Sequence, residues 1–354
     1  MGLPVVPPLP PMLARLTREL PVEDGFIYEP KWDGFRCIAF RDGDSVDLRS
    51  RNQRPLARYF PELVEALIKL PARRIVLDGE IVIFGENGFD FAALMSRLHP
   101  AASRVERLRR ETPACFIAFD LIATEQDVRE VPFERRRRQL EENLTDAPDH
   151  LVVTAATDDP EVAQRWLDAS TGTGVDGVMA KHRELPYQPG RRTMVKVKPD
   201  RTADCVVGGF RVFAEDRLVA SLLLGLYGPD GRLRHVGVTA SFTEARRREL
   251  YAELMPRVVS LSGHPWEEGF GLGHSPIGRL GGAAAQWTPE LPQDWLAVAP
   301  ELVAEVGFDH WDGQRFRHPT RFRHFRDDRG ASSCTFDQLE VGSRFELERF
   351  LASG

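Results

Sequence analysis

The sequence has few cysteines and no long apolar run. Its four cysteines lie far apart and form no C-x-x-C pair, which argues against a zinc knuckle or a disulfide framework and favours a reducing cytoplasm. No stretch approaches the roughly 18–20 uninterrupted apolar residues that a membrane helix requires. Prolines interrupt the apolar N-terminus, and no basic residues lead it in, so a signal peptide is not expected.

Lysine is also scarce. Of the 47 basic residues only five are lysines, namely Lys31, Lys69, Lys181, Lys196 and Lys198. Arginine keeps its proton, whereas lysine is a compact charge that can lose its proton and become a nucleophile. A lysine in so arginine-rich a chain therefore marks a place where arginine does not suffice. Four of the five lie in strand-like segments beside glycine, proline or carboxylates, and these segments direct the search for chemistry.

The chain has 354 residues, enough for two or three domains, and 42% hydrophobic and 28% charged residues, as in soluble globular proteins. Its net charge of −6 divides into −3 for residues 1–200 and −3 for 201–354, so binding to a polyanion must use local patches. Beyond a boundary near 199–203, short β-like runs with glycine turns suggest a small barrel, for which the OB fold is one candidate.

Apolar periodicity and turn residues predict the elements of both parts. In the first part we expect an extended arm over the first eleven residues, paired strands over 25–50, further strands at 74–84, 115–123, 174–182 and 192–199, and helices at 60–70, 91–99, 131–144 and 161–170. In the second part we expect strands at 205–213, 218–228, 233–240, 302–311 and 315–322, and a helix at 243–258.

A lysine stands beside an aspartate and a glycine in EPKWDGFR, residues 29–36. An attacking lysine must be neutral, and with a reference pKa of about 10.4 only about one in a thousand is neutral near pH 7.4. Burial or nearby positive charge must lower that pKa before the lysine can form a covalent intermediate. The alternative for Lys31 is a hairpin with a lysine on its surface.

Two carboxylates, Asp78 and Glu80, share one face of the strand LDGEIVIF, residues 77–84. Burying them costs free energy unless a partner compensates their charge. A basic side chain, a metal ion or a ribose hydroxyl would serve, and the alternative is a carboxylate capped by the backbone of a turn.

The pattern of carboxylate, glycine and lysine recurs in DGVMAK, residues 176–181. Further on, Lys196 and Lys198 share a strand face with no acid between them. Adjacent ammonium groups repel each other, so this pair favours a partner that carries phosphate. The alternative is a solvated edge strand, where lysine is common.

Together these segments resemble the covalent nucleotidyltransferases, and specifically the ATP-dependent DNA ligases. The chain presents the family's segments in order: KWDGFR (31–36) as motif I, SRN (50–52) as Ia, LDGEIVIF (77–84) as III, FIAFD (116–120) as IIIa, DGVMAK (176–181) as IV, VKVKP (195–199) as V and FRDDR (325–329) as VI. With no N-terminal DNA-binding domain, the chain looks most like the minimal bacterial ligase C group, which is related to the ligase domain of ligase D.

The resemblance implies a two-domain α+β protein. Residues 1–200 would form an adenylyltransferase domain of ATP-grasp-like antiparallel sheets with helices, and residues 201–354 an OB-fold β-barrel. The implied enzyme uses ATP and Mg²⁺ or Mn²⁺ to seal 5′-phosphate/3′-hydroxyl nicks in double-stranded DNA through a lysyl-AMP intermediate. Its implied setting is DNA repair in the bacterial cytoplasm, at the nucleoid, as a monomer with DNA-repair proteins as partners.

The resemblance also implies a role for each matching residue. Lys31 would be the nucleophile, Glu29 would border the adenine amino group and Phe119 would stack on the purine. Other contacts to ATP or AMP would come from Arg36, Arg51, Glu80, Met179, Lys181, Lys196 and Lys198. Glu80 and Asp176 would hold the metal. In motif VI, Arg326 and Asp328 would orient the leaving pyrophosphate, and Arg329 is the third residue of that motif.

Two positions depart from the family pattern. Motif IV usually has glutamate, and Asp176 is one methylene shorter, so its metal contact is expected to be indirect or water-mediated. Motif VI usually ends in lysine, where this chain has Arg329. Outside the motifs, the basic run at 135–138 is expected to be a solvated helix face, with contact to DNA phosphate as the alternative. The glycines at 269–282 are expected to be a loop of the OB domain.

Two other functions compete with this interpretation. RNA-capping guanylyltransferases and RNA ligases share the K-x-D-G chemistry, although SRN, FIAFD and DGVMAK resemble DNA ligases better. A non-catalytic OB-type binder of single strands would need basic grooves interleaved with aromatic residues. That class gives no reason for lysines at 31, 181, 196 and 198.

Overall fold

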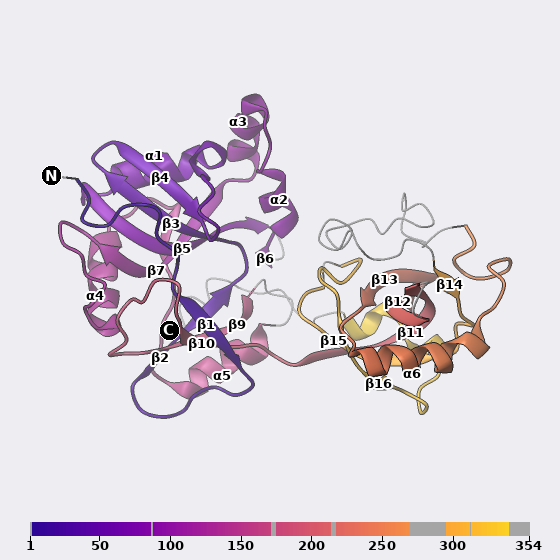
Figure 1. The fold of residues 1–354 in the computed structure, drawn as a ribbon. Coiled ribbons are helices and arrows are strands. Elements are labelled where there is room, and N and C mark those ends of the chain that lie inside the picture. The colour runs from indigo at the N-terminus through magenta and orange to yellow at the C-terminus, as the bar shows by residue number, and fades with distance from the viewer. Residues whose placement is uncertain are drawn as a thin grey trace. The chain divides into compact units, whose positions relative to one another are not determined.

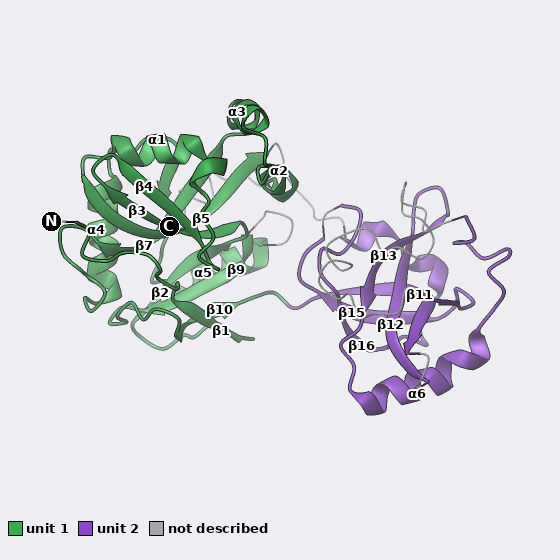
Figure 2. Cartoon of the chain, turned by 45° about the horizontal axis from the view of Figure 1, so that its top comes forward, with its two compact units in different colours: residues 1–199, 342–354 green, residues 200–341 purple. Residues whose placement is uncertain are grey.

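The computed structural model describes residues 2–85, 88–170, 175–213, 217–268, 295–311 and 313–339. The chain divides into two compact units, the first reaching Pro199 and the second beginning at Asp200 (Figure 2). Sheets with a few helices build both units, so the α+β prediction is confirmed as far as a mixed fold of strands and helices. In the described part of the chain, no helix combines the length and apolar character needed to cross a membrane.

Two sheets form the first unit (Figure 1). The smaller sheet has the order β1 (Leu13–Thr17), β10 (Arg192–Val197), β9 (Val175–His182) and β2 (Phe26–Trp32). The larger has the order β4 (Ser45–Ser50), β3 (Phe35–Asp42), β5 (Arg74–Gly85), β7 (Ala114–Ala123) and β8 (Leu151–Val153), with β6 (Gly88–Phe89) paired to β5.

The predicted strand pairing over 25–50 is half right. β3 and β4 form the expected hairpin around Gly43, whereas β2 pairs with β9 in the other sheet. The chain therefore passes from one sheet to the other at Asp33–Gly34, two residues after Lys31. This crossing places the lysine where the two sheets meet.

Helices cover both sheets because each presents an apolar stripe to a sheet. α1 (Pro61–Lys69) and α4 (Phe133–Leu144) pack on the larger sheet, beside α2 (Phe91–Ser96) and α3 (Ala102–Glu111), and α5 (Pro160–Ala169) packs on the smaller sheet. Every residue of β7 is buried, as expected for a central strand covered on both faces. The sequence patterns missed α3, β1 and β8.

The predicted N-terminal arm is structured rather than loose. Val5, Leu9 and Met12 are buried in a cluster with Ile38 and Tyr187. The strand that follows, β1, pairs in parallel with β10, from Leu13 opposite Arg192 to Thr17 opposite Val197. The arm therefore completes both the core and one sheet of the first unit.

The second unit is built on one sheet. Its order is β13 (Leu233–Thr239), β12 (Leu218–Tyr227), β11 (Arg201–Phe213), β15 (Val303–Phe308) and β16 (Arg321–Phe325), with β14 (Leu296–Ala297) paired to β11 and α6 (Glu244–Leu254) packed on β12. Among the described residues β13 and β16 are its two edges, and no continuous strand pairing closes them into a barrel. A single bridge between Thr239 and Thr320 links the two edges. The predicted loop at 269–282 and the end of the second domain at 354 lie outside the described residues.

Candidate active site

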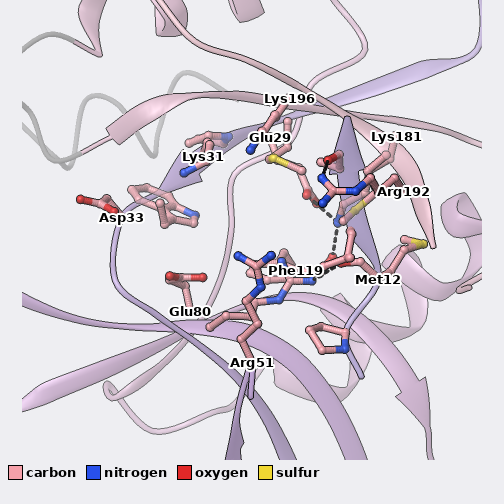
Figure 3. A pocket seen from close by; sticks show the side chains of 18 residues that line it. Met12, Glu29, Lys31, Asp33, Arg51, Glu80, Phe119, Lys181, Arg192 and Lys196 are labelled. Carbon is pink, nitrogen blue, oxygen red and sulfur yellow. Dashed lines mark hydrogen bonds and ion pairs between the residues drawn. The ribbon is translucent and has the colours of Figure 1, made fainter. Parts of the chain in front are cut away.

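A cavity of about 200 Å³ opens in the first unit (Figure 3). Nine of the residues that the motifs predicted line it: Glu29, Lys31, Arg36, Arg51, Glu80, Phe119, Met179, Lys181 and Lys196. These residues come from β2, β3, β5, β7, β9, β10 and the turn after β4. Segments far apart in the sequence therefore meet around one space, as the motif order predicted.

Lys31 lies at the centre of an ion-pair cluster. Its Nζ is 2.6 Å from Oδ2 of Asp176, and the same oxygen lies 2.8 Å from Nζ of Lys198. Burial lowers the pKa of Lys31, but the charge and hydrogen bond of Asp176 outweigh burial and leave that pKa raised. Burial raises the pKa of Asp176, but the charges and hydrogen bonds of Lys31 and Lys198 lower it by more, so this pKa is lowered overall. Asp176 and Lys198 lie beside the cavity without lining it.

Two motif glycines allow this close assembly. A Cβ on Gly34 would lie 2.2 Å from the carbonyl oxygen of Ile81, and its N–H donates to Oε1 of Glu80 at 3.0 Å. Gly177 has a φ of +128°, and a Cβ there would lie 2.1 Å from the carbonyl oxygen of Val197. Any other residue would push β3 off β5, or β9 off β10, and thereby displace Lys31 or Asp176.

Glu80 is the most perturbed carboxylate that lines the cavity. Burial raises its pKa to about 7, against the lowering effects of Arg36 and Lys31. A carboxylate with such a pKa gains from a cation or a hydroxyl donor that replaces the lost water.

The carboxylates at the cavity fit a metal ion that is bound jointly by the protein and by the phosphates of ATP. Within the residues described, no three His, Cys, Asp or Glu side chains form a cluster that would hold a metal by themselves. Mg²⁺ in nucleotide sites is bound by one or two carboxylates together with substrate phosphates, which requires no such cluster. Glu80 and Asp176, both within electrostatic reach of Lys31, supply that number of carboxylates.

Arg36 is fixed by a buried carboxylate. Its Nε and Nη2 donate to the two oxygens of Asp78, each at 2.6 Å, and the hydroxyl of Tyr187 donates to Asp78 at 2.6 Å. Asp78 therefore has the basic partner that the sequence required of it. The guanidinium lies over Phe119, 4.3 Å from the ring centroid, so Arg36 and the Phe119 ring contact each other at the cavity.

Glu29 is 2% exposed and carries two ion pairs. Lys181 Nζ lies 2.7 Å from its Oε2, and Arg137 Nη1 donates to its Oε1 at 3.0 Å. The expectation of a solvated basic run at 135–138 is wrong for its two central residues. Arg136 is fully buried and Arg137 is 8% exposed. Each forms an ion pair with a buried carboxylate, Asp120 or Glu29, which offsets the free-energy cost of burying its charge.

Cations also line the cavity on the side formed by β10. Arg192, Met194 and Lys196 alternate along β10, and all three line the cavity. Burial, Lys31 and Lys198 lower the pKa of Lys196, and Arg51 contributes to the lowering. Such mutual repulsion is relieved by a bound polyanion, so this side is suited to phosphate.

The motif VI residues belong to the second unit. Arg326 donates to both oxygens of Asp328 at 2.7 and 2.8 Å, and those hydrogen bonds lower the pKa of Asp328 to about 2. Arg326 and Arg329 both contact Asp204 of β11. The three predicted residues are thus neighbours of one another, as their spacing implies.

Some lining residues were not predicted. Met12 reaches the cavity through the arm, and its backbone N–H donates to the Tyr187 hydroxyl at 3.2 Å. No motif covers either residue. Arg192 and Met194 could have been found, because they continue the alternation of Lys196 and Lys198 on the same strand face.

Comparison with known proteins agrees with this site. Residues 11–198 match the family described as ATP dependent DNA ligase domain, and residues 215–329 match ATP dependent DNA ligase C terminal region. DNA ligase C2 of Mycolicibacterium smegmatis is 48% identical over 343 residues, and DNA ligase C of Mycobacterium tuberculosis is 46% identical over 346 residues. Each alignment covers 96% of this chain and 96% of the relative.

A solved structure from a study of Lig E DNA ligases has a TM-score of 0.53 at 18% identity. It covers 89% of this chain and 99% of that chain, and at this identity the likeness shows the fold alone. The two family matches and the two close relatives confirm the resemblance drawn from the motifs. The chain belongs to the ATP-dependent DNA ligase family, and its activity is that of a DNA ligase that uses ATP.

Proposed function

We propose that Lys31 is the residue that this ligase adenylylates. The observation that carries the proposal is its place on the wall of the cavity, with Asp176 on its Nζ and Lys196 and Arg51 close by. After losing a proton, Nζ attacks the α-phosphorus of ATP, a P–N bond forms, and the bond to the β-phosphate breaks to release pyrophosphate. Asp176, the carboxylate in contact with Nζ, is the nearest acceptor for that proton.

The bound AMP then passes to DNA. The 5′-phosphate of a nick attacks the phosphorus of lysyl-AMP, and the P–N bond breaks. The 3′-hydroxyl next attacks the 5′-phosphate, a phosphodiester bond forms and AMP leaves. Because such transfers depend on positioning and charge neutralisation, a cavity wall rich in lysine and arginine suits them.

The cavity walls suggest where each part of ATP binds. We assign the purine to Phe119 and Met179 with Glu29 at its amino edge, the ribose to Arg36 and Glu80, and the phosphates to Lys196, Lys198 and Arg51. Lys181 is 1% exposed and holds Glu29 and the carbonyl oxygen of Phe119, so its contribution to nucleotide binding runs through those two residues.

Mg²⁺ or Mn²⁺, when bound with ATP, would offset the negative charge of the phosphates as pyrophosphate departs. Glu80 and Asp176 are the residues we assign to hold it. Asp176 is already in contact with two lysines, which supports a water-mediated contact to the metal rather than a direct one.

We also propose the domain roles. Residues 1–200 act as the adenylyltransferase domain with ATP-grasp-like sheets, and residues 201–354 as an OB-fold domain. Arg326, Asp328 and Arg329 in that domain orient the departing pyrophosphate. The five-strand order of the second unit, with a bridge between its edge segments, supports an OB barrel.

We further propose that the enzyme is a monomer that seals nicks during DNA repair in the bacterial cytoplasm, at the nucleoid, with repair proteins as partners. Relatives named as multifunctional non-homologous end joining DNA repair protein LigD, 31% identical over 86% of this chain, support the repair role. The chain spans 36% of those relatives, so only their matching part bears on this protein.

Incubation with ATP and Mg²⁺, followed by intact mass and peptide mapping, tests the central proposal. We expect a mass increase of one AMP on the peptide that contains Lys31. Labelling of a different residue would refute the assignment, and a GMP adduct formed preferentially from GTP would favour capping chemistry.

A further inference from the structure

The charge network behind Glu29 includes a residue that no motif contains. Arg137, on α4, donates to one oxygen of the Glu29 carboxylate while Lys181 contacts the other. The distances are 3.0 and 2.7 Å, and Glu29 lines the cavity although it is 2% exposed. In Figure 3 the ion pair between Lys181 and Glu29 lies at the edge of the cavity near Phe119.

Arg137 is itself held on three sides. Its Nε donates to Oε1 of Glu141 at 2.6 Å, and its Nη2 donates to the backbone carbonyl of Thr154. The hydroxyl of Thr154 accepts from Nε1 of Trp32 at 2.8 Å. The guanidinium that fixes Glu29 is thus tied to the residue that directly follows Lys31.

This arrangement restricts what Glu29 can recognise. A carboxylate in two ion pairs accepts hydrogen bonds and donates none, and each oxygen keeps one lone pair free after its ion pair. An amino group at position 6 of a purine donates to such an oxygen, whereas an oxo group there repels it. A carboxylate free to rotate would discriminate less.

We propose that Arg137 is a positioning residue that fixes Glu29 for selection of 6-amino over 6-oxo purine nucleotides. The inference rests on the proposed contact between Glu29 and the adenine amino group. Lys181 approaches from the opposite oxygen, so it cannot by itself prevent the carboxylate from turning. Lys181 therefore mainly compensates the charge of Glu29, and Arg137 fixes the orientation of its carboxylate.

The test compares three nucleotides in formation of the enzyme adduct, followed by intact mass. They are ATP, GTP and the purine ribonucleoside triphosphate that lacks the 6-amino group. Arg137→Gln should lower the preference for ATP over the other two by about tenfold or more, the effect of losing a well-placed hydrogen bond to a charged group. Arg137→Lys should recover part of that preference.

Glu141→Gln is the matched control. It removes the charge of Glu141 but keeps an amide oxygen that can accept from Nε of Arg137, and it lies on the outer side, where the Glu141 side chain is 52% exposed, so it should leave the nucleotide preference unchanged. If Arg137→Gln slows all three nucleotides by the same factor, Arg137 supports only the fold and the inference is overturned. A melting curve of each variant shows whether a uniform loss comes from unfolding.

Glu29→Gln separates this inference from the proposed function. If Glu29→Gln keeps the preference for ATP, the assigned contact with adenine fails. If Glu29→Gln loses the preference while Arg137→Gln keeps it, Glu29 reads the base without help from Arg137, and only the positioning inference fails.

Discussion

Lys31 and Asp176 form an ion pair at 2.6 Å, although 145 residues separate them in the sequence. The pair holds the predicted nucleophile as an ammonium group, because Asp176 raises its pKa beyond what burial removes. The resting site thus stores Lys31 in its unreactive form. In the proposed function, ATP brings phosphates for Lys196 and Lys198, and their negative charge would change the electrostatics around this pair.

Lys31→Arg should be as inactive as Lys31→Ala in forming the enzyme–AMP adduct. Arginine keeps the charge and can keep the ion pair with Asp176, but its pKa of about 12.5–13.8 places the neutral form about 7–9 kcal/mol out of reach at pH 7.4. Intact mass after incubation with ATP and Mg²⁺ measures the adduct. Substantial adenylylation of the arginine variant would remove Lys31 from this role.

Phe119→Ala should weaken the use of ATP far more than Phe119→Tyr or Phe119→Trp. Stacking needs a ring face and contributes about 0.5–1.5 kcal/mol beyond buried area, and the ring also carries the guanidinium of Arg36. The KM for ATP in adduct formation gives the comparison. An equal loss in all three variants would indicate that the ring serves only the core.

Tyr187→Phe should lower the free energy of unfolding by about 1.5–3 kcal/mol, because Asp78 loses a buried hydrogen bond to its charge. The KM for ATP should also rise, since Asp78 orients Arg36. Urea unfolding and adduct kinetics measure the two effects. Tyr251→Phe, in the second unit, is the control that should leave the KM unchanged, and an unaltered KM in Tyr187→Phe would show that Arg36 needs no such support.

His235→Gln should make the protein less sensitive to acid. Desolvation, with Arg211 and Arg315, lowers the pKa of His235 from 6.5 to about 3. Between pH 6.5 and about 3, the unfolded chain therefore takes up a proton at His235 while the folded protein does not. The free energy of unfolding then decreases by about 1.4 kcal/mol for each unit by which the pH is lowered. Denaturation at pH 7 and at pH 4.5 should show a smaller difference in the variant. The exposed His318, changed to Gln, should reproduce the wild-type difference; if His235→Gln does so too, His235 does not drive the effect.

Arg326→Ala should cripple ligation from ATP while largely sparing the sealing of a nick that is already adenylylated. Pyrophosphate departs only in the first reaction, and contacts to a transferring phosphoryl group are worth about 10²–10³ in rate. Both rates are measured on one preparation, with circular dichroism to check folding. Equal losses in the two reactions would mean that FRDDR does not act as motif VI.

The sequence allowed most strands of the first unit and the residues around the cavity to be predicted. The cavity residues could be predicted because they lie in short motifs built around glycines such as Gly34 and Gly177. The site requires close backbone approaches there, and only glycine permits them. Strand partners could not be predicted in the same way. Nothing local in FIYEPKWDGF indicates that β2 pairs with β9 rather than with β3, since that choice depends on residues 150 positions away.

Charge patterns misled where the partner was distant. Four consecutive arginines suggest a solvated helix face. Arg136 and Arg137 are nevertheless buried, because they form ion pairs with Asp120 on β7 and Glu29 on β2. The prolines of the first eleven residues concealed a segment that packs against Tyr187. In both cases the missing information was a contact across the fold, which no local pattern contains.

The parallel pairing of β1 with β10 also has a consequence for synthesis. The strand at Leu13 leaves the ribosome early, and its partner at Arg192 follows almost 180 residues later. At about 5–20 residues per second, the first strand waits on the order of ten seconds or more for its neighbour. The cavity, whose wall includes Met12 and Lys196, is therefore completed only after β10 has emerged. A nascent or truncated chain that ends before β10 therefore lacks the wall that we assign to the phosphates of ATP.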